Sequence, residues 1–258
     1  MVQIPFWDTE MRWITRIRLF GYFFFTALVF MAVFLPEFFF VYLLMLSTHD
    51  FILWVSIALT LPILYLISTL LFGIIHSQIV CKFFLPKIRP GKYIHGSDIA
   101  MLFGVAIVSP SIFKSMLKAF SFIPHIYSMF LGKLLSLYGL KAGNNVYLSA
   151  GTMIDSHLVS IGDNSFIGLR AIIAAHITEN RYLTIAPVKI GKGVTIGGNT
   201  IIAPGAEIGD GAIIGVNSLV KKRQKIPANT VYGGTPAHYI RDVDKETDEE
   251  NLSNDNQI

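Results

Sequence analysis

Residues 188–220 read VKIGKGVTIGGNTIIAPGAEIGDGAIIGVNSLV, and an aliphatic residue occupies every sixth position of this stretch. The aliphatic positions are Ile190, Ile196, Ile202, Ile208, Ile214 and Val220. An amphipathic helix repeats every 3.6 residues and a hairpin strand every two, so neither produces this period. A short fixed period is typical of a solenoid, in which each repeat supplies one short strand and one turn. Three hexads then close one coil of a three-sided prism, with the aliphatic side chains stacked in columns along its axis.

The same period extends upstream of this stretch. Ile161, Ile167 and Ile173 keep it, and Leu148 and Ile154 begin it. Glycine follows most of the isoleucines and permits tight corners between the strands. We therefore predict that residues 143–241 form a left-handed parallel β-helix.

The period is interrupted after Ile173. From Ile173 to Ile190 there are 17 residues, one fewer than three hexads, and the aliphatic pattern is lost between them. The stretch that lacks the pattern, residues 175–188, contains His176 and the polar run Glu179, Asn180 and Arg181. A polar loop that leaves a regular prism is a candidate functional segment.

The composition separates a membrane part from a soluble part. Hydrophobic residues make up 53% of the chain and charged residues 15%, and the mean hydropathy is +0.56. The net charge of +4 is too small to indicate nucleic acid as a partner. Cys81 is the only cysteine, so it cannot form an intrachain disulfide, and we interpret it as a packing residue.

The apolar residues concentrate in the first third of the chain. No Lys or Arg lies between Arg18 and Lys82, and this interval holds two spans of about 20 residues. We place one from Leu19 to at least Leu35 and the other over residues 51–72, so residues 1–82 form a membrane anchor. Basic residues precede the first span and follow the second, which predicts cytoplasmic termini and a cytoplasmic β-helix at the inner (cytoplasmic) membrane.

Two further segments complete the domain organisation. Residues 83–142 contain two stretches with helical spacing of apolar residues, which begin near Ile112 and Ile126, and we predict an amphipathic helical connector at the membrane surface. Glu37 is expected at the outer headgroup level, where Pro36 would bend the chain. Residues 242–258 are acidic and polar and are predicted to be disordered. The predicted fold class is thus an α+β membrane protein.

The β-helix region resembles the hexapeptide-repeat acyltransferases, which include the galactoside, maltose and xenobiotic acetyltransferases. The resemblance is carried by the Ile-Gly hexads, the histidine-bearing loop and the closing sequence GGTPAHYIR at residues 233–241. The whole chain also resembles the membrane-bound terminal units of polylysine-synthetase-type enzymes, through the two spans and the sequence PGKY at residues 90–93.

The resemblance implies an acyl thioester, with acetyl-CoA as the first choice of co-substrate, and a histidine that acts as a general base. His176 matches the position of that histidine, and an imidazole titrates near neutral pH. His157 is the rival base, because it resembles the catalytic histidine of serine acetyltransferase. Asp155 and His157 lie about one coil before His176, where they could orient its ring or share its proton. A third reading is that both histidines are merely polar loop residues.

The resemblance also suggests binding residues. Backbone N–H groups for the acyl group would come from Gly197, Gly198 and Asn199. The phosphates of coenzyme A would be bound by Lys221 and Lys222, although a solvated corner explains these lysines equally well. The loop residues Glu179, Asn180 and Arg181 are candidates for contact with the acceptor, whereas a solvated loop explains their polarity without any function. No metal site is expected, because a third histidine ligand is lacking.

Three functions remain open at this point. The first is a membrane-anchored acyltransferase, working as a homotrimer by analogy with the family, that acylates a hydroxyl or amine of a lipid-linked or otherwise membrane-associated acceptor. The second is an amide-bond-forming enzyme that uses an aminoacyl or carrier-bound thioester. The third is a non-catalytic trimeric membrane scaffold.

Overall fold

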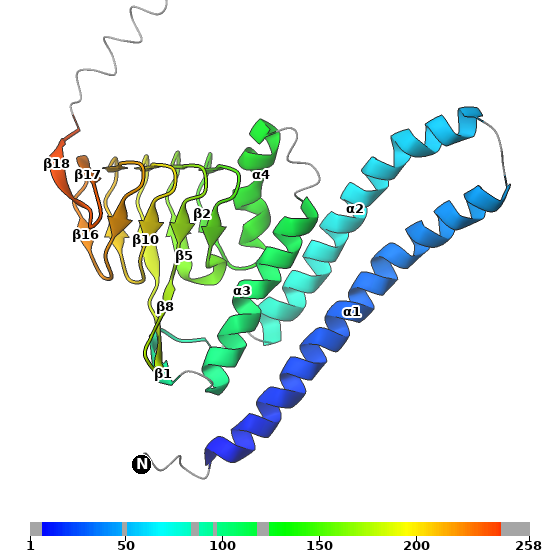
Figure 1. The fold of residues 1–258 in the computed structure, drawn as a ribbon, viewed down its shortest axis with the longest axis horizontal. Helices are drawn as coiled ribbons and strands as arrows, with labels where there is room; N and C mark the ends of the chain where they lie inside the picture. Colours follow the sequence, from blue (N-terminus) through cyan, green and yellow to red (C-terminus); the bar gives the residue numbers. More distant parts are fainter. Residues whose placement is uncertain (1–6, 48–50, 84–87, 95–96, 118–123, 244–258) are drawn as a thin grey trace, which may run out of the picture. The chain divides into compact units, whose positions relative to one another are not determined.

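The protein is described by a computed structural model, which covers residues 7–47, 51–83, 88–94, 97–117 and 124–243 (Figure 1). Its contacts divide the chain into two units. The helical unit comprises Met1–Ile123, Leu134–Gly139 and Thr178–Leu183. The β-helix unit comprises Pro124–Lys133, Leu140–Ile177 and Thr184–Ile258. The predicted acidic tail from residue 244 onward lies outside the described residues.

The helical unit is built on α1 (Trp7–Ser47), α2 (Phe51–Phe83) and α3 (Asp98–Leu117). Parts of all three are long and apolar enough to cross a membrane, namely Thr15–Leu44, Val55–Val80 and Asp98–Met116. The first two coincide with the predicted spans. The third was not anticipated, since α3 begins well before Ile112, where the helical spacing of apolar residues becomes visible.

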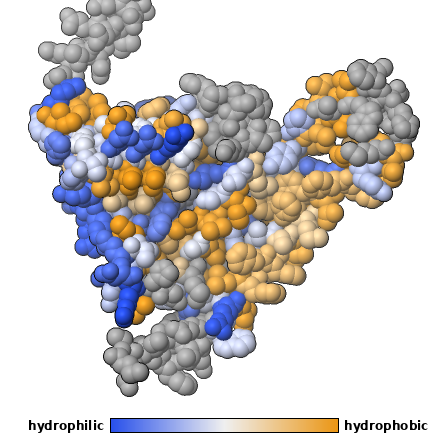
Figure 2. Space-filling model, in the orientation of Figure 1, coloured by the Kyte–Doolittle hydropathy of each residue, from blue (hydrophilic) through white to orange (hydrophobic). Residues whose placement is uncertain are grey.

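The outer surfaces of α1 and α2 are apolar (Figure 2). Large aromatic side chains on α1 are more than half exposed, among them Phe20, Phe23, Phe38 and Phe39. In water such a surface would be costly, whereas a hydrocarbon environment accepts it.

Several polar side chains inside the helical unit are paired with one another. The Ser68 hydroxyl on α2 donates a hydrogen bond to a carboxylate oxygen of Glu37 on α1. α1 continues through Pro36 to Ser47, and Glu37 lies inside the apolar segment Thr15–Leu44. Its expected position at the outer headgroups stays a prediction. Apolar helices tolerate proline when neighbouring helices pack around the break.

A second polar group joins four segments of the helical unit. The His76 ring is buried and its nitrogens lie 2.9 Å from the Tyr138 hydroxyl and 3.2 Å from the Thr26 hydroxyl. One turn before Thr26, the hydroxyls of Tyr22 and Ser109 lie 3.0 Å apart. These contacts connect α1, α2, α3 and the segment that follows α4 (Pro124–Ser136).

The β-helix unit contains three parallel sheets formed by short strands. The first sheet has the order β16-β13-β10-β5-β2, the second contains β17-β14-β11-β6-β3, and the third is β15-β12-β7-β4. We call their outward surfaces face B, face C and face D in that order. The bounds of the strands are as follows: β2 Lys141–Ala142, β3 Tyr147–Leu148, β4 Met153–Ile154, β5 Val159–Ile161, β6 Phe166–Ile167, β7 Ile172–Ile173, β10 Val188–Ile190, β11 Thr195–Ile196, β12 Ile201–Ile202, β13 Glu207–Ile208, β14 Ile213–Ile214, β15 Leu219–Val220, β16 Lys225–Ile226 and β17 Thr230–Gly233.

The period of six predicted this arrangement correctly. Strands one coil apart pair in parallel, so that Ile190 aligns with Ile208, Ile196 with Ile214, and Ile202 with Val220. Every one of these side chains is buried. A fully buried isoleucine contributes about 1.5–3 kcal/mol relative to an exposed one, so the aligned columns hold the coils in register.

Close backbone contacts form the corners of the β-helix, and an added element covers each of its ends. At Gly197, a Cβ atom would lie 2.5 Å from the backbone nitrogen of Val216, so only glycine permits the close approach of these coils. α4 lies against the first coil, where a Cβ at Gly132 would be 3.5 Å from the Val146 carbonyl. At the other end, β18 (His238–Asp242) pairs antiparallel with β17. Both ends of the stack are thereby covered, as solenoids require.

We expect Ile196→Ala to lower the unfolding free energy of the β-helix by about 2–5 kcal/mol, because it opens a cavity at a fully buried position. Thr195→Ala, at the adjacent exposed position, should change it by less than about 0.5 kcal/mol. Denaturation of the detergent-solubilised protein, followed by circular dichroism, measures both. Equal effects of the two substitutions would contradict the inward orientation of the isoleucine column.

Candidate active site

The predicted interruption of the hexads is a β-hairpin. After β7 the chain forms β8 (His176–Glu179), turns at Asn180 with φ of 53°, and returns as β9 (Tyr182–Ile185) before β10. The Ala186 N–H donates to the Ala175 carbonyl at 2.8 Å and closes the base of the hairpin. The sequence pattern predicted a loop here, and the structure adds that His176 is the first residue of a strand.

Asp155 and His176 form a short, partly buried pair. A single carboxylate oxygen of Asp155 lies 2.6 Å from Nδ1 of His176 and accepts the Ala175 N–H at 2.7 Å. The Asp155 side chain is 9% exposed and the His176 side chain 31% exposed. An ionised carboxylate can only accept hydrogen bonds, so Nδ1 carries the proton and Nε2 carries the lone pair. The imidazole is therefore oriented by Asp155, with Nε2 as its basic nitrogen.

His157 is in a different environment. It belongs to the 3-10 turn Ser156–Leu158, and both ring nitrogens are shielded from solvent. Burial lowers the pKa of His157 to about 4, and the Asp155 charge opposes this only in part. With so low a pKa, His157 is a weak proton acceptor at neutral pH, and the geometry favours His176 as the base.

The other predicted site residues lie on two edges of face D. Gly197, Gly198 and Asn199 form the turn between β11 and β12, at the edge shared with face C. Lys221 and Lys222 follow β15 at the edge shared with face B, which is the edge where the hairpin leaves after β7. Within one chain the glycine turn is thus on the edge opposite to His176.

Glu179, Asn180 and Arg181 lie at the tip of the hairpin and are exposed. Among the described residues, no group of three or more His, Cys, Asp or Glu side chains could hold a metal ion.

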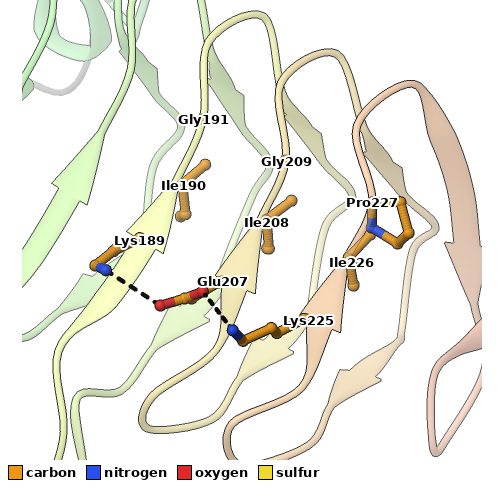
Figure 3. Close-up of a pocket in the computed structure, with 9 residues that line it drawn as sticks. All are labelled: Lys189, Ile190, Gly191, Glu207, Ile208, Gly209, Lys225, Ile226 and Pro227. Carbon is orange, nitrogen blue, oxygen red and sulfur yellow. Dashed lines mark hydrogen bonds and ion pairs between the residues drawn. The ribbon is translucent and has the colours of Figure 1, made fainter.

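An open groove of about 410 Å³ occurs on face B (Figure 3). It is lined by β10, β13 and β16 and the residues that follow them. Glu207 pairs with Lys189 at 3.1 Å and with Lys225 at 3.5 Å across neighbouring coils. The hydrogen bond from Lys189 lowers the pKa of Glu207. The groove contains neither Asp155 nor His176, and its charges pair with one another.

Sequence reasoning missed one element near the hairpin. The strand β1 (Gly91–Ile94) lies beside β9 in a three-stranded sheet of order β1-β9-β8. No sequence periodicity predicted the pairing of β1 with β9, and PGKY at residues 90–93 was the sole local signal for β1.

A three-sided parallel β-helix built from hexads, with a histidine-bearing hairpin beside a buried carboxylate, indicates the hexapeptide class of transferases. Two family descriptions agree: "Bacterial transferase hexapeptide (six repeats)" matches residues 187–222, and "Hexapeptide repeat of succinyl-transferase" matches residues 158–180. The chain belongs to the hexapeptide-repeat acetyltransferases.

Three relatives illustrate the similarity. The galactoside O-acetyltransferase of Escherichia coli (strain K12) is 34% identical over 112 residues, which are 40% of this chain and 54% of that protein. The Bacillus subtilis (strain 168) protein YvoF, which carries the name of an acetyltransferase, is 35% identical over 44% of this chain and 69% of its own length. The delta-poly-L-ornithine synthetase of Acinetobacter baumannii (strain AB307-0294) is 33% identical over 40% of this chain but only 8% of its own length. The chain thus spans about half of the first relative and a small part of the last.

The buried His157 gives the β-helix a dependence on pH. Its pKa is about 4 in the folded protein against about 6.5 when unfolded, so between these values the unfolded chain binds the proton and the folded chain does not. The contribution of neutral His157 to the unfolding free energy is complete above pH 6.5. It falls as the pH drops towards 4, by at most about 3 kcal/mol. We expect His157→Gln to flatten the pH dependence of unfolding in this window. His238→Gln, on the surface, is the control, and an unchanged profile for His157→Gln would contradict the assignment.

Proposed function

We propose that this protein is a membrane-anchored acyltransferase that moves an acetyl group from coenzyme A to a hydroxyl or amine of a membrane-associated acceptor. The pair formed by Asp155 of the β-helix and His176, the first residue of the hairpin, carries the proposal. Membership of the hexapeptide-repeat acetyltransferases supports acyl transfer from a coenzyme A thioester.

In the proposed mechanism, Nε2 of His176 removes the proton from the acceptor while its oxygen or nitrogen attacks the thioester carbonyl. Asp155 holds the ring orientation and stabilises the imidazolium that forms. The tetrahedral intermediate then collapses, its C–S bond breaks, and His176 returns the proton to the departing thiolate of coenzyme A. An N–H donor is needed for the oxyanion, and the turn of Gly197, Gly198 and Asn199 is the candidate.

A homotrimer would bring the separated groups together. The outward side chains on face D are apolar, and Met153 is 59% exposed and Ile201 40% exposed. Ile172 is aligned between these two residues, and Leu219 is aligned with Ile201 on its other side. Face B instead carries the charged Lys189, Glu207 and Lys225. Association of three copies through face D would place the glycine turn of one copy near His176 of the next. Lys221 and Lys222 lie on the same edge as His176, where they would bind the phosphates of coenzyme A.

The membrane location rests on the helices and on one topological constraint. β1 shares a sheet with the hairpin strands, and the strands of one sheet lie on the same side of a membrane. α3 follows β1 and precedes the hairpin in the sequence, so it does not act as a single crossing. It either lies at the surface or enters and returns with the segment after it. Arg16, Arg18, Arg89 and Lys92 favour the cytoplasmic side of the inner membrane for this sheet and for the β-helix.

Anchoring is useful when the acceptor is confined to the membrane plane. A lipid-linked acceptor meets a tethered catalytic hairpin at a higher effective concentration than it would meet a soluble one. Glu179, Asn180 and Arg181, at the exposed tip of the hairpin, are the residues that we assign to contact with this acceptor.

Amide-bond formation is the second candidate function. The similarity to a stretch of the polyornithine synthetase favours it, because an aminoacyl or carrier-bound thioester could use the same histidine. The two candidates differ in the donor, so turnover of acetyl-CoA without a carrier protein favours the first.

We expect His176→Ala to lower acyl transfer by about 10²–10⁴-fold, since it removes the general base. Asp155→Asn should lower it by at least about tenfold, because the ring loses its charged partner. The assay incubates the detergent-solubilised protein with radiolabelled acyl-CoAs and total lipid extract, and His238→Ala serves as control. Full activity of His176→Ala would contradict the mechanism, whereas the absence of transfer by the wild-type protein would leave the non-catalytic scaffold in its place.

The trimer is tested on face D. We expect Ile201→Glu to dissociate the assembly and to abolish transfer, because a carboxylate would be buried between apolar surfaces. Ser160→Glu on face B, which aligns with Lys189 and Lys141, is the matched control and should leave the assembly intact. Light scattering coupled to size-exclusion chromatography measures the mass, and an unchanged oligomer for Ile201→Glu would exclude this face as the interface.

A further inference from the structure

The hairpin that begins with His176 is completed by a strand from the helical unit. β1 lies at the outer side of β9, and the outer part of the hairpin, Thr178–Leu183, belongs with the helices rather than with the β-helix. β1 comes directly before α3, and α2 ends a few residues before β1. The third strand of this sheet is therefore supplied by the connection between two apolar helices.

A side-chain contact reinforces the backbone pairing. The Lys92 ammonium lies 4.1 Å from the centroid of the Tyr182 ring, and Tyr182 is the first residue of β9. A cation above an aromatic ring is attracted by the electron density of its face. Lys92 and Tyr182 are both exposed at the surface of the sheet, so the contact adds specificity to a pairing that the backbone alone would leave open to slippage.

β1 is itself held firmly by its neighbours in sequence. The Tyr93 hydroxyl donates to the Arg89 carbonyl at 2.8 Å, and the Ser97 N–H donates to the Ile94 carbonyl at 3.0 Å. The Ser97 hydroxyl in turn accepts the Ala100 N–H in the first turn of α3 at 3.4 Å. The orientation of β1 is thus fixed to the start of α3.

We infer that β1 is a positioning element for His176, through which the helical unit sets the conformation of the catalytic hairpin. An isolated two-stranded hairpin is marginally stable in water, and a third strand supplies the missing order. The base of the hairpin is held by the Ala175–Ala186 and Asp155 hydrogen bonds, whereas its outer part depends on β1. Because β8 starts at His176, disorder in the hairpin disturbs the direction of the imidazole.

This inference rests on the proposed function of His176 and extends it. The helices would do more than raise the local concentration of a lipid-linked acceptor. They would support turnover on every acceptor, including one dissolved in water. If the helices served only as a membrane anchor, loss of their contact with the hairpin would leave turnover on a soluble acceptor unchanged.

Proline scanning of β1 in the full-length protein tests the inference. Successive N–H groups of a strand point to opposite sides, so one of Lys92→Pro and Tyr93→Pro removes an N–H directed at β9 and the other removes one directed away. Each proline is compared with alanine at the same position, which separates the backbone from the side chain. Lys92→Met and Tyr182→Leu, singly and together, isolate the cation–aromatic contact.

Two readouts are measured for each variant. Hydrogen exchange of the amides in residues 176–185 reports the order of the hairpin, and steady-state kinetics with a water-soluble acceptor report kcat and the KM for acetyl-CoA. We expect the proline that interrupts the pairing to speed exchange about tenfold and to lower kcat about three- to tenfold, with KM within about twofold. The other proline should behave like its alanine control.

The outcomes are distinguishable. If both prolines leave exchange and kcat at the level of the alanine variants, β1 does not position the hairpin and the inference is overturned. An equal speeding of hydrogen exchange in the strands of the β-helix would also overturn it, because that pattern indicates general loss of the fold. If the wild-type protein turns over no acyl-CoA, the proposed function fails, while hydrogen exchange still decides whether β1 orders the hairpin.

Discussion

Burial of one aliphatic side chain per hexad is the interaction on which the rest of the structure depends. The strands of the β-helix are only two to four residues long, and no strand of that length is stable alone. Alignment of Ile196 with Ile167 and Ile214 places each side chain between its neighbours along the axis. The same alignment brings Asp155 on one coil to the point on the next coil where the hairpin leaves, so the Asp155–His176 pair inherits its geometry from the core.

The sequence predicted the β-helix well because its signal is local and repeated. One strand is predicted by each of Ile190, Ile196 and Ile202. Because one coil consists of three hexads, the sequence also predicted that Asp155 lies near His176. Two features were beyond this reasoning. The hairpin strands have no repeat, and the pairing of β1 with β9 joins residues distant in the sequence through backbone hydrogen bonds that leave no pattern.

The helical unit shows why composition predicts membrane spans but not their internal contacts. Hydropathy located α1 and α2, yet it did not indicate that Glu37 pairs with Ser68 or that His76 joins Thr26 and Tyr138. Polar groups in an apolar surrounding need partners from other helices. Such partners are set by packing, which a single sequence does not display. The early start of α3 escaped notice for a related reason, since its first turns are apolar on all sides.

The base of the hairpin has an evolutionary consequence. Because the chain leaves at Ala175 and re-enters at Ala186, two residues joined by a hydrogen bond, everything between them can lengthen or shorten without shifting a single coil. Asp155 lies on the prism side of that junction, and His176 is the first residue beyond it. A lineage could therefore exchange the outer segment, and with it the range of acceptors, without disturbing the coil that carries Asp155.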